Sequence, residues 1–98
     1  MTAPAIQANL ANITSVGSLA SGEQQLLPAN GNRAGAVIYN ESTAILYLAF
    51  GPAASLTAYT VQIPANGYFE LPGPAIYTGV ISGIWSAANG FARITELS

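Results

Sequence analysis

The amino-acid sequence predicts an all-β protein: a small β-sandwich or jelly-roll-like barrel with an extended N-terminal arm. Short runs rich in β-branched and aromatic residues recur along the chain, and turn-forming Gly, Pro and Asn residues separate them. No convincing helical pattern follows residue 22. The 98 residues, of which 51% are hydrophobic, suffice for one domain with one core. We therefore expect an N-terminal arm at 1–22 and a β-sandwich body at 23–98.

Seven short strands are expected in the body. The run TAYTVQI at 57–63 alternates most clearly, with Tyr59, Val61 and Ile63 on one face. The tripeptide Ala88-Asn89-Gly90 separates the last two runs and predicts a hairpin, because Asn and Gly both tolerate positive φ. These patterns do not determine the order of the strands in space. The expected strands are 23–27, 36–40, 44–50, 57–63, 68–71, 79–85 and 91–97.

The first 22 residues differ from the body, because their apolar residues occur singly among Ala, Ser, Asn, Thr and Gln. The spacing of these apolar residues is weakly helical, but the Asn, Thr, Gly and Ser between them lower the helix propensity. We expect an extended arm that docks on a neighbouring subunit. A first strand plus loop and a disordered tail are the alternatives. The apolar residues of this segment are Ile6, Leu10, Ile13, Val16 and Leu19.

Charged side chains are few, and this scarcity limits the possible functions. The chain has two Arg, four Glu and neither His nor Cys. Enzymes rely on groups with tunable pKa values, such as His, thiolates, Lys or paired carboxylates, so we expect neither enzymatic activity nor catalytic residues. Metal sites rely most on Cys and His, so we expect no metal and no other cofactor. We also expect no small-molecule substrate.

Nucleic acids and membranes are unexpected partners as well. Two Arg without any Lys cannot form the basic patch that binds phosphates or anionic lipids. No run approaches the ~18 apolar residues that span a bilayer. No basic residue precedes the first apolar residues, as it would in a secretory signal. Half of the chain is apolar while few charges cover its surface, so we expect burial in a protein assembly.

Several side chains are candidates for an interface in such an assembly. Tyr and Trp suit a core or a subunit interface, and a carbohydrate-binding surface is a further alternative. Arg33 and Arg93 can each pair with a Glu within the chain or across an interface. The spacing of Glu41 and Glu70 predicts no catalytic pair, and we expect both at solvated strand edges. The residues expected at a partner interface are Ile6, Leu10, Ile13, Val16, Leu19, Arg33, Tyr47, Tyr77, Trp85 and Arg93.

Four motifs follow one another between residues 32 and 97, which is about two thirds of the chain. They are Asn32-Arg33 before AVIYNES, then AILYLAFG, then YTVQIPANGYFELP, and finally YTGVISGIWSAANGFARITEL at 77–97. In this order the motifs resemble a family of small structural proteins from tailed bacteriophages. The last motif is the most specific of the four.

The resemblance implies a virion component that is assembled in the host cytoplasm. Our leading expectation is a capsid decoration (cement) protein on the capsid surface. It would form a homotrimer through apolar strand faces, bridge subunits of the major capsid protein and stabilise the phage head. A tail, neck or baseplate module is the alternative. A carbohydrate-binding module, with Tyr77 and Trp85 as the stacking platform, is a second alternative from another class.

Overall fold

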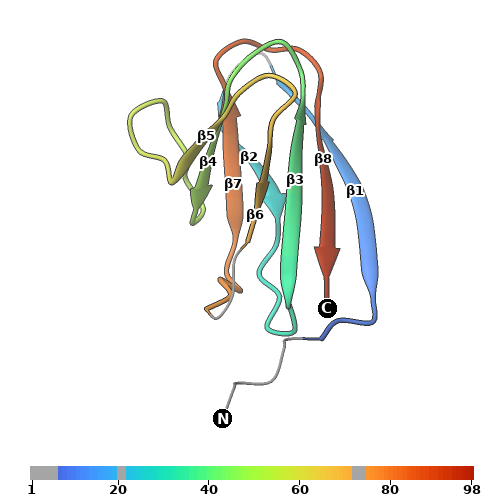
Figure 1. Ribbon diagram of the computed structural model, residues 1–98. Coiled ribbons are helices and arrows are strands. Elements are labelled where there is room, and N and C mark those ends of the chain that lie inside the picture. The colour runs from blue at the N-terminus through green and yellow to red at the C-terminus, as the bar shows by residue number, and fades with distance from the viewer. Residues whose placement is uncertain (1–6, 20–21, 72–74) are drawn as a thin grey trace.

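The computed structural model describes residues 7–19, 22–71 and 75–98, and these residues form two antiparallel sheets without any helix. This confirms the all-β prediction and the small β-sandwich (Figure 1). No helix in the described ranges could cross a membrane. The strands are β1 (Ala11–Gly17), β2 (Gln24–Leu27), β3 (Gly35–Glu41), β4 (Leu46–Phe50), β5 (Val61–Ile63), β6 (Tyr68–Glu70), β7 (Ile81–Trp85) and β8 (Phe91–Leu97).

The strands alternate between the two sheets along the chain. The first sheet, sheet A, has the order β1-β8-β3-β6, and the second, sheet B, has the order β2-β7-β4-β5. Every connection crosses from one sheet to the other except the one between β4 and β5. This interleaved order is that of an eight-stranded jelly roll, the more specific of the two architectures expected from the sequence. Figure 1 shows the four strands of sheet A side by side.

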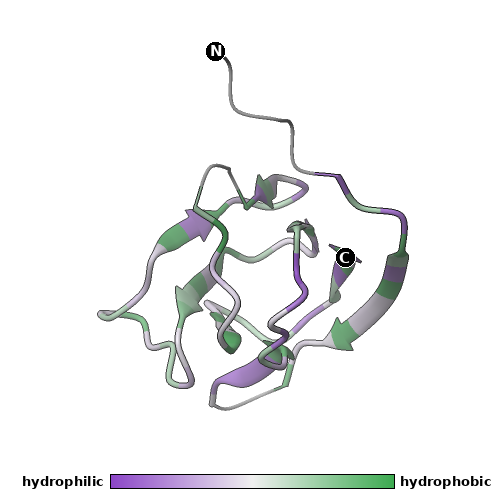
Figure 2. Ribbon diagram, turned by 90° about the horizontal axis from the view of Figure 1, so that it is seen from below, coloured by the Kyte–Doolittle hydropathy of each residue, from purple (hydrophilic) through white to green (hydrophobic). Residues whose placement is uncertain are grey.

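Part of the expected arm belongs to the body. Strand β1 pairs with β8 along its whole length, from Ala11 opposite Leu97 to Gly17 opposite Phe91. Residues 11–17 are therefore an edge strand of sheet A, which matches the alternative of a first strand plus loop. The alternation of hydrophobic and hydrophilic residues along β1 is visible at the right of Figure 2. Ile6 lies outside the described residues.

The predicted hairpin at Ala88-Asn89-Gly90 is wrong, because β7 and β8 lie in different sheets. The chain still bends here, with Gly90 at φ 69°. The Asn89 side-chain oxygen accepts a hydrogen bond from the Thr43 N–H at 2.8 Å. A Cβ at Gly90 would collide with the Glu41 carbonyl oxygen. The turn therefore packs against the β3–β4 connection, and Gly is required there because the two crossing loops touch.

Strand β5 is shorter than the predicted strand at 57–63, because the residues before it form a local turn. Ser55 Oγ accepts a hydrogen bond from the Ala58 N–H at 2.8 Å. The Ser55 N–H in turn donates to the Ala58 carbonyl at 2.9 Å. Such local bonds compete with a sheet ladder. Ile63 is buried and Val61 packs against the core as expected, whereas Tyr59 lies outside the strand.

The core fills the space between the two sheets. Alternate residues of each strand point into it, as in β4, where Leu46 and Leu48 are fully buried and Tyr47 between them is not. Both sheets contribute aliphatic side chains, so neither sheet can form its buried face alone. The large apolar side chains with the least exposure are Ile38, Leu46, Leu48, Ile63, Ile81 and Ile94.

Candidate interaction surface

The outer face of sheet A presents side chains from all four of its strands. Ile38 and Ile94 are fully buried, so the residues on either side of each point outward. The strand register aligns these outward residues in rows across the sheet. We call this surface the sheet A face. It consists of Ile13, Ser15, Val37, Tyr39, Glu41, Tyr68, Glu70, Phe91, Arg93, Thr95 and Leu97.

The sheet A face is unusually apolar for the outside of a sandwich. The exposed fraction is 74% for Ile13, 63% for Tyr68 and 43% for Phe91. Antiparallel sheets ordinarily turn polar residues to the solvent. Aromatic residues and Arg are enriched at the centres of protein–protein interfaces, and this face carries both, beside Glu41 and Glu70. The composition of this face therefore suits contact with another protein.

Arg93 lies in the middle of the sheet A face and joins three of its strands. Its guanidinium donates to Glu41 Oε2 at 2.8 and 3.2 Å and to Ser15 Oγ at 2.9 Å. The guanidinium carbon also lies 4.4 Å from the centre of the Phe91 ring. These contacts hold the guanidinium in place on the sheet while its side chain stays 42% exposed. A positioned, partly dry Arg beside an aromatic ring is a frequent centre of binding energy.

The outer face of sheet B is partly covered, because the 51–60 loop between β4 and β5 folds over Ala49 and Ser82, while Gln25 and Gln62 stay exposed. Ser82 Oγ, on the outer side of β7, donates to the Gly51 carbonyl at 2.7 Å. The same oxygen accepts a hydrogen bond from the Ala54 N–H at 3.1 Å. Under this loop Ser82 is fully buried and Ala49 nearly so. The molecule thus covers the part of this outer face around Ala49 and Ser82 itself.

Tyr47 shares in this cover, although the sequence predicts it at a partner interface. Its ring meets the ring of Tyr59 edge to face, with the centroids 5.0 Å apart. Tyr47 is half-buried as a result, while Tyr59 is the more exposed of the two. The Tyr47 ring therefore packs largely against its own chain.

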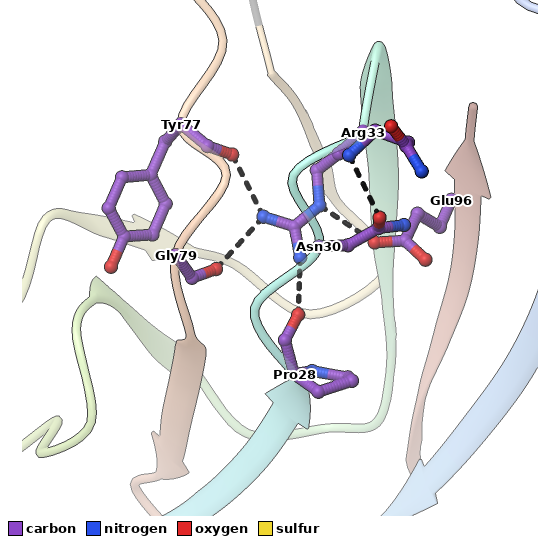
Figure 3. Close-up of polar contacts among 7 residues, drawn as sticks. Pro28, Asn30, Arg33, Tyr77, Gly79 and Glu96 are labelled. Carbon is purple, nitrogen blue, oxygen red and sulfur yellow. Dashed lines mark hydrogen bonds and ion pairs between the residues drawn. The ribbon is translucent and has the colours of Figure 1, made fainter.

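Arg33 is buried at one end of the sandwich and does not face a partner (Figure 3). Its Nε donates to Glu96 Oε2 at 2.8 Å. The two terminal nitrogens donate to the carbonyls of Tyr77 at 2.8 Å, Gly79 at 3.0 Å and Pro28 at 2.7 Å. The side chain has no exposed surface, and its four bonds tie two loops to β8. Of the two placements open to this Arg, the intramolecular one is observed.

Trp85 and Tyr77 belong to the interior rather than to a binding platform. Trp85 is only 7% exposed, and its ring N–H donates to the side-chain oxygen of the fully buried Asn40 at 3.2 Å. Tyr77 stacks on Phe50 with ring centroids 4.7 Å apart and the planes within 2°. A sugar needs an open aromatic face. Trp85 offers none, and one face of Tyr77 is already occupied.

The structure brings together two of the residues predicted at an interface, Ile13 and Arg93, on the sheet A face. Leu10 and Leu19 are exposed just beyond the two ends of β1, and Val16 packs against the core. Sequence reasoning missed the largest aromatic contributors to the face, which are Tyr68 and Phe91. The sequence does carry one signal for this surface. In the 91–97 run, apolar residues occupy positions of both strand faces, so the outer face of this strand is not purely polar.

The charged groups of the sheet A face are Arg93, Glu41 and Glu70. Glu41 is paired with Arg93, and Glu70 lies in the neighbouring row opposite Val37. Within the described ranges, no three His, Cys, Asp or Glu side chains gather as metal ligands would. Comparison of the chain with protein-family models, curated proteins and solved structures gave no match. The function is therefore argued from the surface itself.

Proposed function

We propose that this protein is a structural component of a bacteriophage virion, a capsid decoration protein that binds across neighbouring subunits of the major capsid protein. The sheet A face would lie against the shell, and the loop-covered face of sheet B would point away from it. One observation carries this proposal. A broad apolar and aromatic face is left open on sheet A, whereas a loop of the chain covers part of the outer face of sheet B.

Two further points support the proposal. The bacteriophage-like stretch at 32–97 supplies three of the four strands of sheet A, namely β3, β6 and β8. The jelly-roll architecture recurs in viral capsid proteins, and also in lectins and cupins. The second point is an analogy between folds, and a fold alone does not assign a function.

The action of such a protein is mechanical. Each copy contributes a modest apolar contact, and many copies over one shell resist expansion together, because the shell cannot open without breaking many contacts at once. Few charges take part in this contact, so salt, which screens charge–charge interactions, should weaken it little. We therefore expect attachment to change little between low and moderate ionic strength.

The copy number in purified particles separates the head from the tail. A ratio of one chain per major capsid subunit, or a simple fraction of it, is expected for a decoration protein. A handful of copies per particle would place the protein in the tail, neck or baseplate instead. Quantitative gel densitometry against the major capsid protein gives this ratio directly.

Rebinding to capsids that lack the protein tests which face is used. Tyr68→Glu places a charge on the sheet A face, where its desolvation opposes binding, so we expect at least about a tenfold loss of affinity. Leu56→Glu is the matched control, because Leu56 is similarly exposed but lies in the 51–60 loop over sheet B. Equal binding by the two variants would contradict the use of the sheet A face. Failure of the wild-type protein to rebind would contradict the proposed function.

A further inference from the structure

Strand β1 is the one edge in the described sandwich that lacks the usual protection against pairing with another strand. Strands β5 and β6 have three residues each, with Pro64 directly after β5 and Glu70 within β6. Strand β2 has four residues and an irregular register between Gln25 and Leu27. Short strands, charges, prolines and bulges all discourage edge-to-edge pairing. Strand β1 has seven residues with neither a charge nor a proline.

The backbone of β1 shows which of its groups are free to pair. Leu10 and Ser98 exchange both backbone hydrogen bonds, at 2.9 and 3.0 Å, and the Ser18 N–H donates to the Gly90 carbonyl at 3.1 Å. Bonded positions alternate along an antiparallel ladder, so the even-numbered residues of β1 bond to β8. The odd-numbered residues direct their N–H and C=O groups away from β8. These residues are Ala11, Ile13, Ser15 and Gly17.

We propose that β1 is the contact between two copies of this chain, which pair antiparallel about a two-fold axis at Thr14. In this register Ile13 lies opposite Ser15 of the second copy, and Ala11 lies opposite Gly17. Each of the four outward residues then exchanges hydrogen bonds with an outward residue of the other copy. The two A sheets join into one continuous sheet, and the two sheet A faces become one surface.

A second copy fits this edge because the edge is complementary to itself. The same register that satisfies all four outward residues brings Ile13 of the two copies into diagonal contact across the axis, where cross-strand side chains can reach one another. It also covers an Ile13 side chain that is 74% exposed in the single chain. The two charges opposite β1 on β8 are already paired, Arg93 with Glu41 and Ser15 and Glu96 with Arg33, so pairing does not bring free like charges together.

The contact is small, and this sets the expected strength of the dimer. Seven residues of strand extend about 23 Å. Leu10 and Leu19 lie just beyond its two ends and add apolar area. Stable interfaces bury on the order of 1,200–2,000 Å² in total, and one paired strand with its flanks falls at or below the lower end. We therefore expect a reversible dimer whose population rises with protein concentration. A two-fold pair also differs from the trimer expected at the sequence level.

Sedimentation of the purified full-length protein over a broad concentration range tests the association. We expect monomer and dimer in exchange. Ile13→Lys should raise the dissociation constant at least about tenfold, because it places two like charges in diagonal contact across the axis. Gln25→Lys is the matched control, since it adds the same charge to an exposed position on the edge strand β2, and it should leave the dissociation constant unchanged.

Amide hydrogen exchange distinguishes edge pairing from any other association. The Thr14 amide bonds to β8 and should be protected at every concentration, whereas the Ile13 and Ser15 amides should gain protection only as the dimer forms. A protein that stays monomeric throughout would overturn the proposal, as would a trimer. A dimer in which the Ile13 and Ser15 amides stay unprotected would overturn it too. Capsid rebinding by the Tyr68 and Leu56 variants is a separate result, so this proposal and the proposed function can fail independently.

Discussion

The outer faces of the two sheets differ in how the chain covers them, although both sheets belong to one jelly roll. On sheet B the outward positions Ala49 and Ser82 are small, so the 51–60 loop can lie directly on the strands and bond to Ser82. On sheet A the central outward positions are large, as at Tyr39 and Arg93, and the Tyr39 hydroxyl donates to the Asn66 side chain of the β5–β6 connection at 3.2 Å. The small outward side chains Ala49 and Ser82 thus leave room for the loop on this part of sheet B. The face that the chain leaves open is the one available to a partner.

The largest expected effect on stability comes from breaking the buried contacts of Arg33, which tie two loops to β8. Arg33→Ala should lower the free energy of unfolding by about 3–5 kcal/mol, because it leaves a largely buried Glu96 carboxylate and three carbonyls without their donor. Urea unfolding followed by Trp85 fluorescence measures this change. A loss smaller than about 1.5 kcal/mol would show that water replaces the guanidinium, and that Arg33 does not hold the loops in place.

A smaller effect is expected from uncovering sheet B. Ser82→Ala removes both bonds that Ser82 Oγ makes to the 51–60 loop and leaves the buried Ala54 N–H without an acceptor, which costs about 1–3 kcal/mol. The loop should also become sensitive to proteases. Ser86→Ala is the matched control, because Ser86 accepts a more exposed bond from the Ile45 N–H and its loss should cost less. If the two variants have the same free energy of unfolding, and if the 51–60 loop resists cleavage in both, the position of the loop does not depend on Ser82.

The smallest effect on stability is expected on the sheet A face. Arg93→Gln breaks a pair whose two side chains are 42% and 49% exposed, so solvent screening limits the loss to about 1 kcal/mol or less. The variant should nevertheless rebind capsids less well, because Arg93 stands where the partner would lie. Thermal unfolding and the rebinding assay together check this. A variant that is strongly destabilised would make Arg93 a structural residue like Arg33.

The strands were predictable because each follows from neighbours in the sequence, and the places where prediction failed depend on distant residues. Apolar runs bounded by turn residues located the seven strands of the body, although β4, β5 and β7 are shorter than expected. The Asn89-Gly90 turn was recognised, but its neighbours pair with other strands, and no local signal reveals that. Arg33 follows the turn residues Asn30-Gly31-Asn32 and Arg93 lies within the run at 91–97, and neither neighbourhood shows which of the two is buried. Only the long-range contact of residue 33 with Glu96 and the 77–79 segment buries one of them.

The candidate surface was harder to predict than the fold, for the same reason. Ile13 and Arg93 were expected at an interface, but nothing in the sequence places them on one face. The two residues lie close together only because β1 pairs with β8 in a particular register. Tyr68 joins the same face through β3, which is a further pairing between distant segments. A surface built from four strands becomes visible only when the order of the strands is known.

The position of β8 between β1 and β3 also sets an order of events during synthesis. Strand β1 leaves the ribosome first, yet its only sheet partner is made last among the eight strands. Sheet B can begin earlier, because β4 and β5 are neighbours in both sequence and space. A growing chain therefore carries its unprotected, apolar first strand unpaired until nearly all of the protein has emerged. Folding that must wait for such distant pairing is slow, and the waiting strand is the part most exposed to aggregation.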